Sequence, residues 1–297
     1  MASRGELLRQ LWRDRKAVAG TAILAGFVIL ALVGPWLVVD PMEYAAVPLQ
    51  PPSASHLLGT NGQGQDVLAQ TVCGARMTLL VGFMVGAVVV TLGSAIGIAA
   101  GYLGGRVDDV LSLLVNVFLI IPGLPLAVVI AAYLPAGPAT IALVLIVTGW
   151  SWHARVMRAQ TLAWRSRDCI SAAVVAGESP LRVMFWEILP NMTSLIVSGF
   201  IGATVFAINA QVGLEYLGLG DVNEVTWGTN LYWAANNAAL LTESWWTFVP
   251  TGLCVALVGF ALVLLNSAID EVGNPALRVE RSWLKKVPGA RLRVGLS

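Results

Sequence analysis

Long apolar runs separated by short polar segments dominate the chain. A helix that crosses a bilayer needs about 20 mostly apolar residues, and the sequence offers six candidate runs. These runs are Ala17–Val39, Thr78–Tyr102, Val110–Leu134, Ala139–His153, Ser194–Gly213 and Phe248–Ile269. The pattern predicts an all-α integral membrane protein with six transmembrane helices. Because the fourth run is short, we expect its helix to continue beyond the apolar residues through Arg155 and Arg158.

The second apolar run contains regularly spaced glycines. Small residues four positions apart let helix backbones approach closely in lipid. The glycines of this run are Gly82, Gly86, Gly93, Gly97 and Gly101. We interpret them as positions of ordinary helix packing.

Composition supports the membrane assignment. The chain has 297 residues, of which 57% are hydrophobic and 12% are charged, whereas a soluble domain carries about 25% charged residues. The three cysteines lack C-x-x-C spacing, so we expect them to be unpaired and not to bind a metal. The first apolar run is longer than the core of a signal peptide and lacks a small-residue cleavage pattern, so it is expected to be a retained anchor.

The distribution of basic residues predicts the orientation. Cytoplasmic loops of membrane proteins carry an excess of Lys and Arg. With both termini inside, all but one of the 18 Lys and Arg residues are cytoplasmic, and the exception is Arg76. The expected organisation is a cytoplasmic segment at 1–16, a six-span permease domain at 17–277 and a basic cytoplasmic tail at 278–297.

Recognisable catalytic chemistry is absent from the sequence. There is no GxxxxGK[ST] phosphate-binding loop, and the two histidines belong to no metal-ligand pattern. No ionisable residue lies in the middle of an apolar run, which argues against a proton-coupled carrier that works alone. We therefore expect no catalytic residues, no metal site, no cofactor in this chain and no nucleic-acid partner.

A polar stretch between the fourth and fifth runs, residues 165–191, is expected to be a folded cytoplasmic elbow. Asp168 can cap a short helix, and Gly177 can end that helix in a left-handed conformation. Ser179 and Pro180 are typical of a second helix start, and Pro190 marks entry into the fifth run. Such an elbow favours docking of a soluble partner, although an unpartnered amphipathic loop would show the same spacing.

The elbow resembles the EAA loop of ABC-transporter permeases. Ser171-Ala172-Ala173, then Gly177, then Leu189-Pro190 match its spacing, with Ser171 in place of the usual glutamate and Glu187 in place of isoleucine. The resemblance implies a coupling helix that sits in a groove of a separate ATPase subunit. The residues it implicates are Asp168, Ser171, Ala172, Ala173, Gly177, Glu178, Ser179, Arg182 and Pro190.

A second motif, between the first and second runs, is similar to the peptide branch of this family. Residues 56–68 read HLLGTNGQGQDVL and are followed by Gly74-Ala75-Arg76, which resembles HPLGTDxxGRDVLSR…GAR of dipeptide and oligopeptide permeases. Gln65 replaces the family's arginine. Gly101–Gly105 with Asp108 resembles the family's GYxGGxxD corner, and Glu215–Gly220 with Trp227-Gly228 resembles its E-x-x-LGLG…WG segment. An apolar run before the LGT-type loop is similar to the C-type member of the paired permeases.

The resemblance implies the type I importer permease fold in a bacterial inner membrane. It also implies a homologous B-type permease, two ATP-binding subunits or one fused ATPase that hold ATP and Mg²⁺, and an external substrate-binding protein. The implied cargo is a di- or oligopeptide, with oligosaccharides and nickel chelates as alternatives. A membrane assembly or scaffold protein that shares only the elbow is the alternative from another class.

Polar and aromatic residues outside the elbow suggest where cargo and its delivery protein make contact. Asn209 and Gln211 lie in the fifth run, but they are about 200° apart around a helix and cannot both face one path. Interhelical hydrogen bonding is the competing interpretation. External contacts with the delivery protein are expected from Asp66, Glu215, Trp227 and Trp233, and stacking on a sugar is the alternative for the two tryptophans.

Overall fold

The computed structural model describes residues 14–44 and 46–273, and over these residues the protein is helical, with a single isolated bridge between Thr60 and Asp66 as its only β-type pairing. The expected N-terminal segment and basic tail lie largely or wholly outside this range. The elements are α2 (Arg15–Val33), η1 (Gly34–Trp36), α3 (Val67–Leu103), α4 (Gly105–Ile120), α5 (Gly123–Tyr133), α6 (Pro138–Arg165), α7 (Asp168–Val175), α8 (Pro180–Arg182), η2 (Val183–Ile188), η3 (Leu189–Met192), α9 (Thr193–Tyr216), α10 (Trp227–Asn236), η4 (Trp245–Thr247) and α11 (Val249–Gly273).

Five helices of the described chain are long and apolar enough to cross a membrane. The helices α4 and α5 make a sixth span only if the pair is counted as one, and they are bent by 85° with respect to each other. The run Val110–Leu134, predicted as the third span, is thus divided between two helices rather than formed by one. Pro122 explains the break, because proline has no N–H to donate and keeps the preceding residue out of the helical region. Ile121 accordingly has an extended ψ of 126°.

The ends of the other helices follow local signals in the sequence, namely proline and capping residues. The first helix ends at Val33, before the 3-10 turn that contains Pro35, rather than at Val39. The second starts at Val67, because the Asp66 carboxylate accepts a hydrogen bond from the Ala69 N–H and caps the helix. With 37 residues, this helix is about 55 Å long and exceeds a hydrocarbon core of about 30 Å. The expected continuation of α6 past Arg155 and Arg158 is confirmed.

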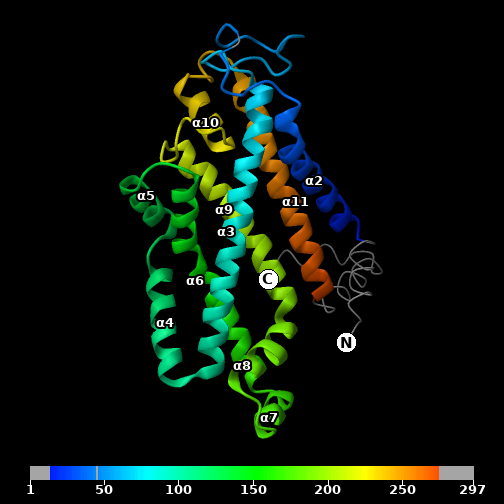
Figure 1. Cartoon of the computed structure of the whole chain (residues 1–297), viewed down its shortest axis with the longest axis vertical. Helices are drawn as coiled ribbons and strands as arrows, with labels where there is room; N and C mark the ends of the chain where they lie inside the picture. Colours follow the sequence, from blue (N-terminus) through cyan, green and yellow to red (C-terminus); the bar gives the residue numbers. More distant parts are fainter. Residues whose placement is uncertain (1–13, 45, 274–297) are drawn as a thin grey trace, which may run out of the picture.

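The long helix α3 is the centre of the bundle, with α6 on one side, α2 and α11 on the other, and α9 crossing α3 between them (Figure 1). Its glycines allow these close contacts. A Cβ atom at Gly86 would clash with Thr204 of α9, and one at Gly97 would clash with the backbone of Ala154 in α6. The interpretation of the glycines as packing positions is therefore confirmed.

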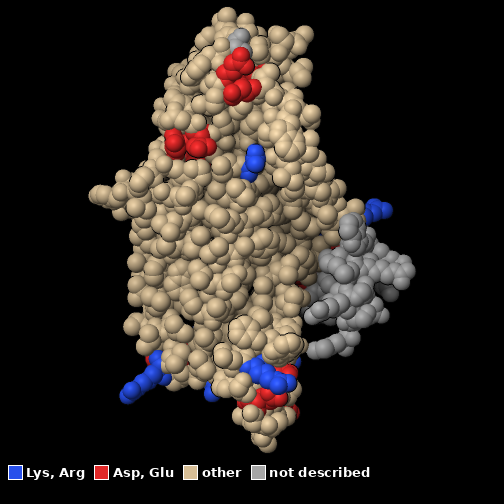
Figure 2. Space-filling model, viewed as in Figure 1, with Lys and Arg blue, Asp and Glu red and all other residues tan. Residues whose placement is uncertain are grey.

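Basic residues gather at one end of the molecule. Figure 2 shows most of the visible Lys and Arg atoms at the end that carries α7, with acidic atoms among them, whereas acidic patches predominate near the opposite end. The positive-inside rule places the α7 end in the cytoplasm. The orientation of the chain remains a prediction from this rule.

Candidate functional site

The elbow has the backbone that its sequence predicts. α7 ends in a Schellman motif, in which the N–H of Gly177 bonds to the Val174 carbonyl at 3.0 Å and that of Glu178 bonds to the Ala173 carbonyl at 3.1 Å. Gly177 has φ of +82°, which glycine adopts without strain. Ser179 accepts from the Arg182 N–H at 3.4 Å and caps α8. The predicted turn between two helices is confirmed.

Two details of the elbow differ from expectation. Asp168 is the first helical residue of α7, and its side chain does not cap the helix, whose N-cap position is Arg167. The second helix does not stop before Pro190. It passes from α8 through the π-helical turn η2 and the 3-10 turn η3 into α9, because Pro190 lacks the N–H for a regular α-helical bond and occupies the tighter turn instead.

An apolar inner face fixes the elbow to the bundle. Ile170 of α7 and Val183 and Ile188 of η2 are buried against Ile98 of α3 and Met157 of α6. The elbow is thus continuous with the cores of two spanning helices. A displacement of α7 would be transmitted to them through packed side chains rather than through a flexible linker.

The outer face of the elbow exposes large apolar side chains. Val175 is 89% exposed, Trp186 is 75% exposed, and Leu181 and Phe185 are also exposed. Large exposed apolar side chains on a polar segment between two spans are candidate contacts for a partner. We call Val175, Leu181, Phe185 and Trp186 the elbow patch.

Most of the residues that the sequence implicated in coupling are exposed. These are Asp168, Ser171, Ala172, Gly177, Ser179, Arg182 and Pro190. Ala173 and Glu178 are half-buried, and Glu178 Oε2 forms an ion pair with Arg182 Nε at 2.9 Å. Sequence reasoning missed the exposed apolar side chains of the same segment. The apolar residues at 174–175 and 185–186 were the signal that could have revealed them.

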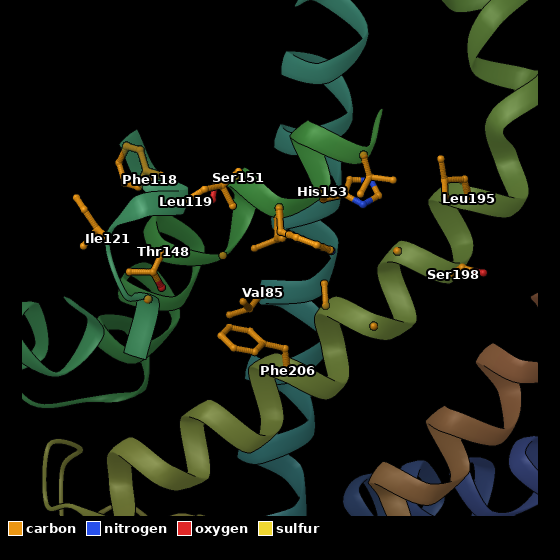
Figure 3. A pocket seen from close by; sticks show the side chains of 18 residues that line it. Val85, Phe118, Leu119, Ile121, Thr148, Ser151, His153, Leu195, Ser198 and Phe206 are labelled. Atoms are coloured by element: carbon orange, nitrogen blue, oxygen red, sulfur yellow. The ribbon is translucent and has the colours of Figure 1, made fainter. Parts of the chain in front are cut away.

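A cavity of about 610 Å³ lies between α4, α6 and α9, with α3 behind it (Figure 3). Phe118, Leu119 and Thr148 lie on one side, Leu195 and Ser198 lie on the other, and Phe206 lies between the two sides. No aspartate, glutamate, lysine or arginine is among the residues that line it. A cavity of this size and composition can accommodate a small organic molecule.

The polar groups of the cavity are mostly engaged with the protein. His153 Nε2 is 3.0 Å from Ser94 Oγ, the Thr148 hydroxyl donates to the Val144 carbonyl at 2.9 Å, and the Ser198 hydroxyl donates to Asp270 at 2.7 Å. Few polar groups therefore remain to bind a particular functional group.

The two polar residues of the fifth run face in different directions, as their spacing predicted. Asn209 is exposed, on the same face of α9 as Gly202 and the cavity residue Phe206. Gln211 is fully buried, and its Nε2 donates to Glu215 at 3.0 Å. Gln211 therefore lines no open surface in this structure, which corrects its selection as a path residue.

The residues expected to contact a delivery protein are mostly buried. Asp66 and Glu215 are nearly inaccessible, and Asp66 lies 2.8 Å from His56 Nδ1. Trp227 is fully buried and donates its indole N–H to the Thr71 carbonyl at 2.9 Å. Trp233 is half-buried and donates to the Val222 carbonyl at 3.0 Å. The expectation of direct contact is corrected for the three buried side chains, which instead attach loops to the helices.

Glu215 is the most constrained of these residues. Its carboxylate accepts from the Thr226 hydroxyl at 2.6 Å and from Gln211, and a Cβ atom at Gly228 would clash with it. Glu215 thereby joins α9 to the start of α10.

We expect Glu215→Ala to lower the thermal unfolding midpoint of the purified chain, because each buried donor left unpaired costs about 1–3 kcal/mol. Glu215→Gln is the matched control. It retains one oxygen for Thr226, and the Gln211 amide can flip to accept from the new NH₂ group. Equal unfolding midpoints for the two variants would contradict this account.

Several comparisons identify similar proteins. Residues 93–271 match the family model described as "Binding-protein-dependent transport system inner membrane component". Residues 4–52 match the "N-terminal TM domain of oligopeptide transport permease C". The chain is 31% identical over 291 residues to an oligopeptide transport system permease protein of Mycobacterium tuberculosis, covering 96% of this chain and 99% of the relative. It is 30% identical over 275 residues to a dipeptide transport system permease protein of Bacillus subtilis, covering 91% and 85%.

Proposed function

Because this chain belongs to the family of binding-protein-dependent transport system inner membrane components, we propose that it is one permease subunit of an ATP-driven importer of di- or oligopeptides. The observation that carries the coupling role is the elbow, whose inner face packs into the bundle and whose outer face exposes the elbow patch. The peptide cargo is supported by the names of relatives that align over most of the chain.

The proposed mechanism is alternating access driven by partner subunits. Two ATPase subunits, or one fused ATPase, bind ATP and Mg²⁺, and their closure moves the elbow. A nucleotide can shift the equilibrium only if the ATPase groove binds the elbow differently in its two states. A homologous B-type permease supplies the other half of the path, and an external binding protein delivers the cargo. This chain itself catalyses no reaction.

We propose that the cargo path follows the exposed face of α9. Gly202 and Phe206 lie beside the cavity, and Asn209 and Gly213 continue the same face toward the outer end. No atom would meet a Cβ at Gly202 or Gly213. An exposed amide at Asn209 would be costly against lipid, so this face is better suited to a water-filled path.

Cysteine labelling tests this path. We expect Asn209→Cys, in a variant whose three native cysteines are replaced by serine, to react with a membrane-impermeant maleimide in the assembled transporter. Leu253→Cys is the control, because Leu253 is an exposed apolar residue of the spanning helix α11 and is expected to face lipid. Protection of Asn209→Cys in the complex, with and without ATP, would assign this face to the permease interface instead.

Reconstitution tests the function as a whole. The chain is co-expressed with the ATPase, B-type permease and binding-protein genes next to its own, and uptake of labelled di- and oligopeptides into proteoliposomes is measured. ATP-dependent peptide uptake is expected. Uptake of only oligosaccharides or nickel chelates would replace the cargo assignment, and failure to co-purify any ATPase would favour a scaffold protein.

A further inference from the structure

An ion pair joins α4 to α6 beyond the cavity, on the side of the elbow. The Arg158 guanidinium donates from Nε to Asp108 Oδ1 at 2.5 Å and from Nη2 to Oδ2 at 2.6 Å. Ser112 also donates to Oδ1 at 2.8 Å. This bidentate arrangement constrains both distance and orientation. The two side chains are 34% and 17% exposed, so its contribution to folding stability is modest.

The two partners belong to helices on the same side of the cavity. Phe118 and Leu119 of α4 and Thr148 of α6 lie on that side, across from Leu195 and Ser198 of α9. Arg158 lies farther along α6, between these residues and the end of the helix at Arg165. Only two residues separate that end from α7, which begins at Asp168. The ion pair therefore lies between the cavity and the elbow.

α4 is attached to α6 in its second half by apolar packing, because Val115, Phe118 and Leu119 share one cluster with Trp150 and Ala154. Val115 is its only buried residue, and Phe118 makes an edge contact with Trp150 at a centroid distance of 5.3 Å. Its junction with α3 consists of Gly104 and Gly105, both with positive φ, so the turn is built from residues with little steric restriction. Near the start of α4, Asp108 is therefore a principal link to the rest of the bundle.

We propose that the Asp108–Arg158 pair makes α4 follow α6 when the elbow moves, so that docking of the ATPase moves both helices relative to α9 and changes the width of the cavity between them and α9. Asp108 and Arg158 are positioning residues for coupling in this mechanism. The inference rests on the proposed transport function. Without the pair, α6 can move while the α4 wall stays behind, and ATP is hydrolysed without release of cargo.

The test compares single and charge-swapped variants in the reconstituted transporter. Asp108→Asn and Arg158→Gln are each expected to raise the ATP consumed per cargo molecule about tenfold. The double variant Asp108→Arg/Arg158→Asp is expected to recover most of the coupling. Asp109→Asn and Arg155→Gln are matched controls. Asp109 is an exposed residue of α4 and Arg155 is an exposed residue of α6, so each variant removes the same charge from the same helix as the test variant. Normal coupling in the single variants, or no recovery in the swapped variant, would overturn the proposal.

A second readout does not depend on the cargo. Amide hydrogen exchange over residues 105–112 of the purified chain is expected to accelerate in Asp108→Asn and to stay unchanged in Asp109→Asn. If Arg158→Gln does not assemble, Arg158→Lys replaces it. This variant retains the charge but loses the bidentate geometry, and it is expected to accelerate exchange over the same residues. Unchanged exchange in these variants would refute the link. Absence of cargo uptake by the wild type would instead refute the proposed function.

Discussion

Replacement of Gly177 by valine is expected to reduce the cargo carried per ATP about tenfold or more, while the chain still inserts and assembles. At φ of +82° a β-branched residue is strained, and such conformations cost on the order of 1–3 kcal/mol. No atom lies within 4 Å of the position of the added Cβ, so the penalty arises from the backbone alone. Its relief requires loss of the Schellman motif, which reorients α7 relative to Ser179 and Pro180.

Gly177→Asn is the matched control for this prediction. Asparagine tolerates the left-handed region better than valine, so its coupling is expected to lie nearer to that of the wild type. The measurement is the ratio of cargo uptake to ATP hydrolysis in proteoliposomes, with insertion checked by the amount of chain in the membrane. If Gly177→Val transports normally, the shape of the elbow does not control coupling.

Replacement of Val175 by lysine is expected to release the ATPase from the complex. Val175 is the most exposed member of the elbow patch, and anchor residues at the centre of an interface contribute about 2 kcal/mol or more, or roughly 30-fold in affinity. A lysine near the C-terminal end of α7 is favourable for the helix dipole, so the helix itself is not weakened. Co-purification of the ATPase with the tagged chain measures the loss.

Leu241→Lys is the control for Val175→Lys. Leu241 is 87% exposed, close to the 89% of Val175, and it lies shortly after α10 in the sequence. α10 lies at the end of the molecule opposite to α7 (Figure 1). The same chemical change there is expected to leave ATPase binding intact. Equal ATPase recovery for both variants would show that the elbow patch is not the docking surface.

Local sequence signals predicted the elbow well because each signal acts over a few residues. Gly177 ends a helix through its own φ, and Ser179 caps the next helix through a neighbouring N–H. The bend at Pro122 was equally local. It was missed because the apolar run continues on both sides of the proline. Hydropathy shows the length of an apolar run but not the direction of the helix that it forms.

The roles of residues that contact distant parts of the chain could not be predicted from local sequence signals. Glu215 and Trp227 lie in an external segment of the sequence, but Thr226, Thr71 and Thr78 bring them into the interior. Asp108 and Arg158 are 50 positions apart, and nothing in the spacing of either one indicates the other. Their roles depend on the close approach of helices.

The sequence by itself determined the membrane class, the approximate spans, the turn of the elbow and the family resemblance, because these depend on apolar length and on local backbone preference. Only the tertiary structure decided which face of α9 is open, which external residues are buried, and which charged side chains join α4 to α6. The physical reason is that burial and pairing are properties of helices packed against one another. The glycines of α3 permit that packing, but only its three-dimensional outcome shows which side chains meet.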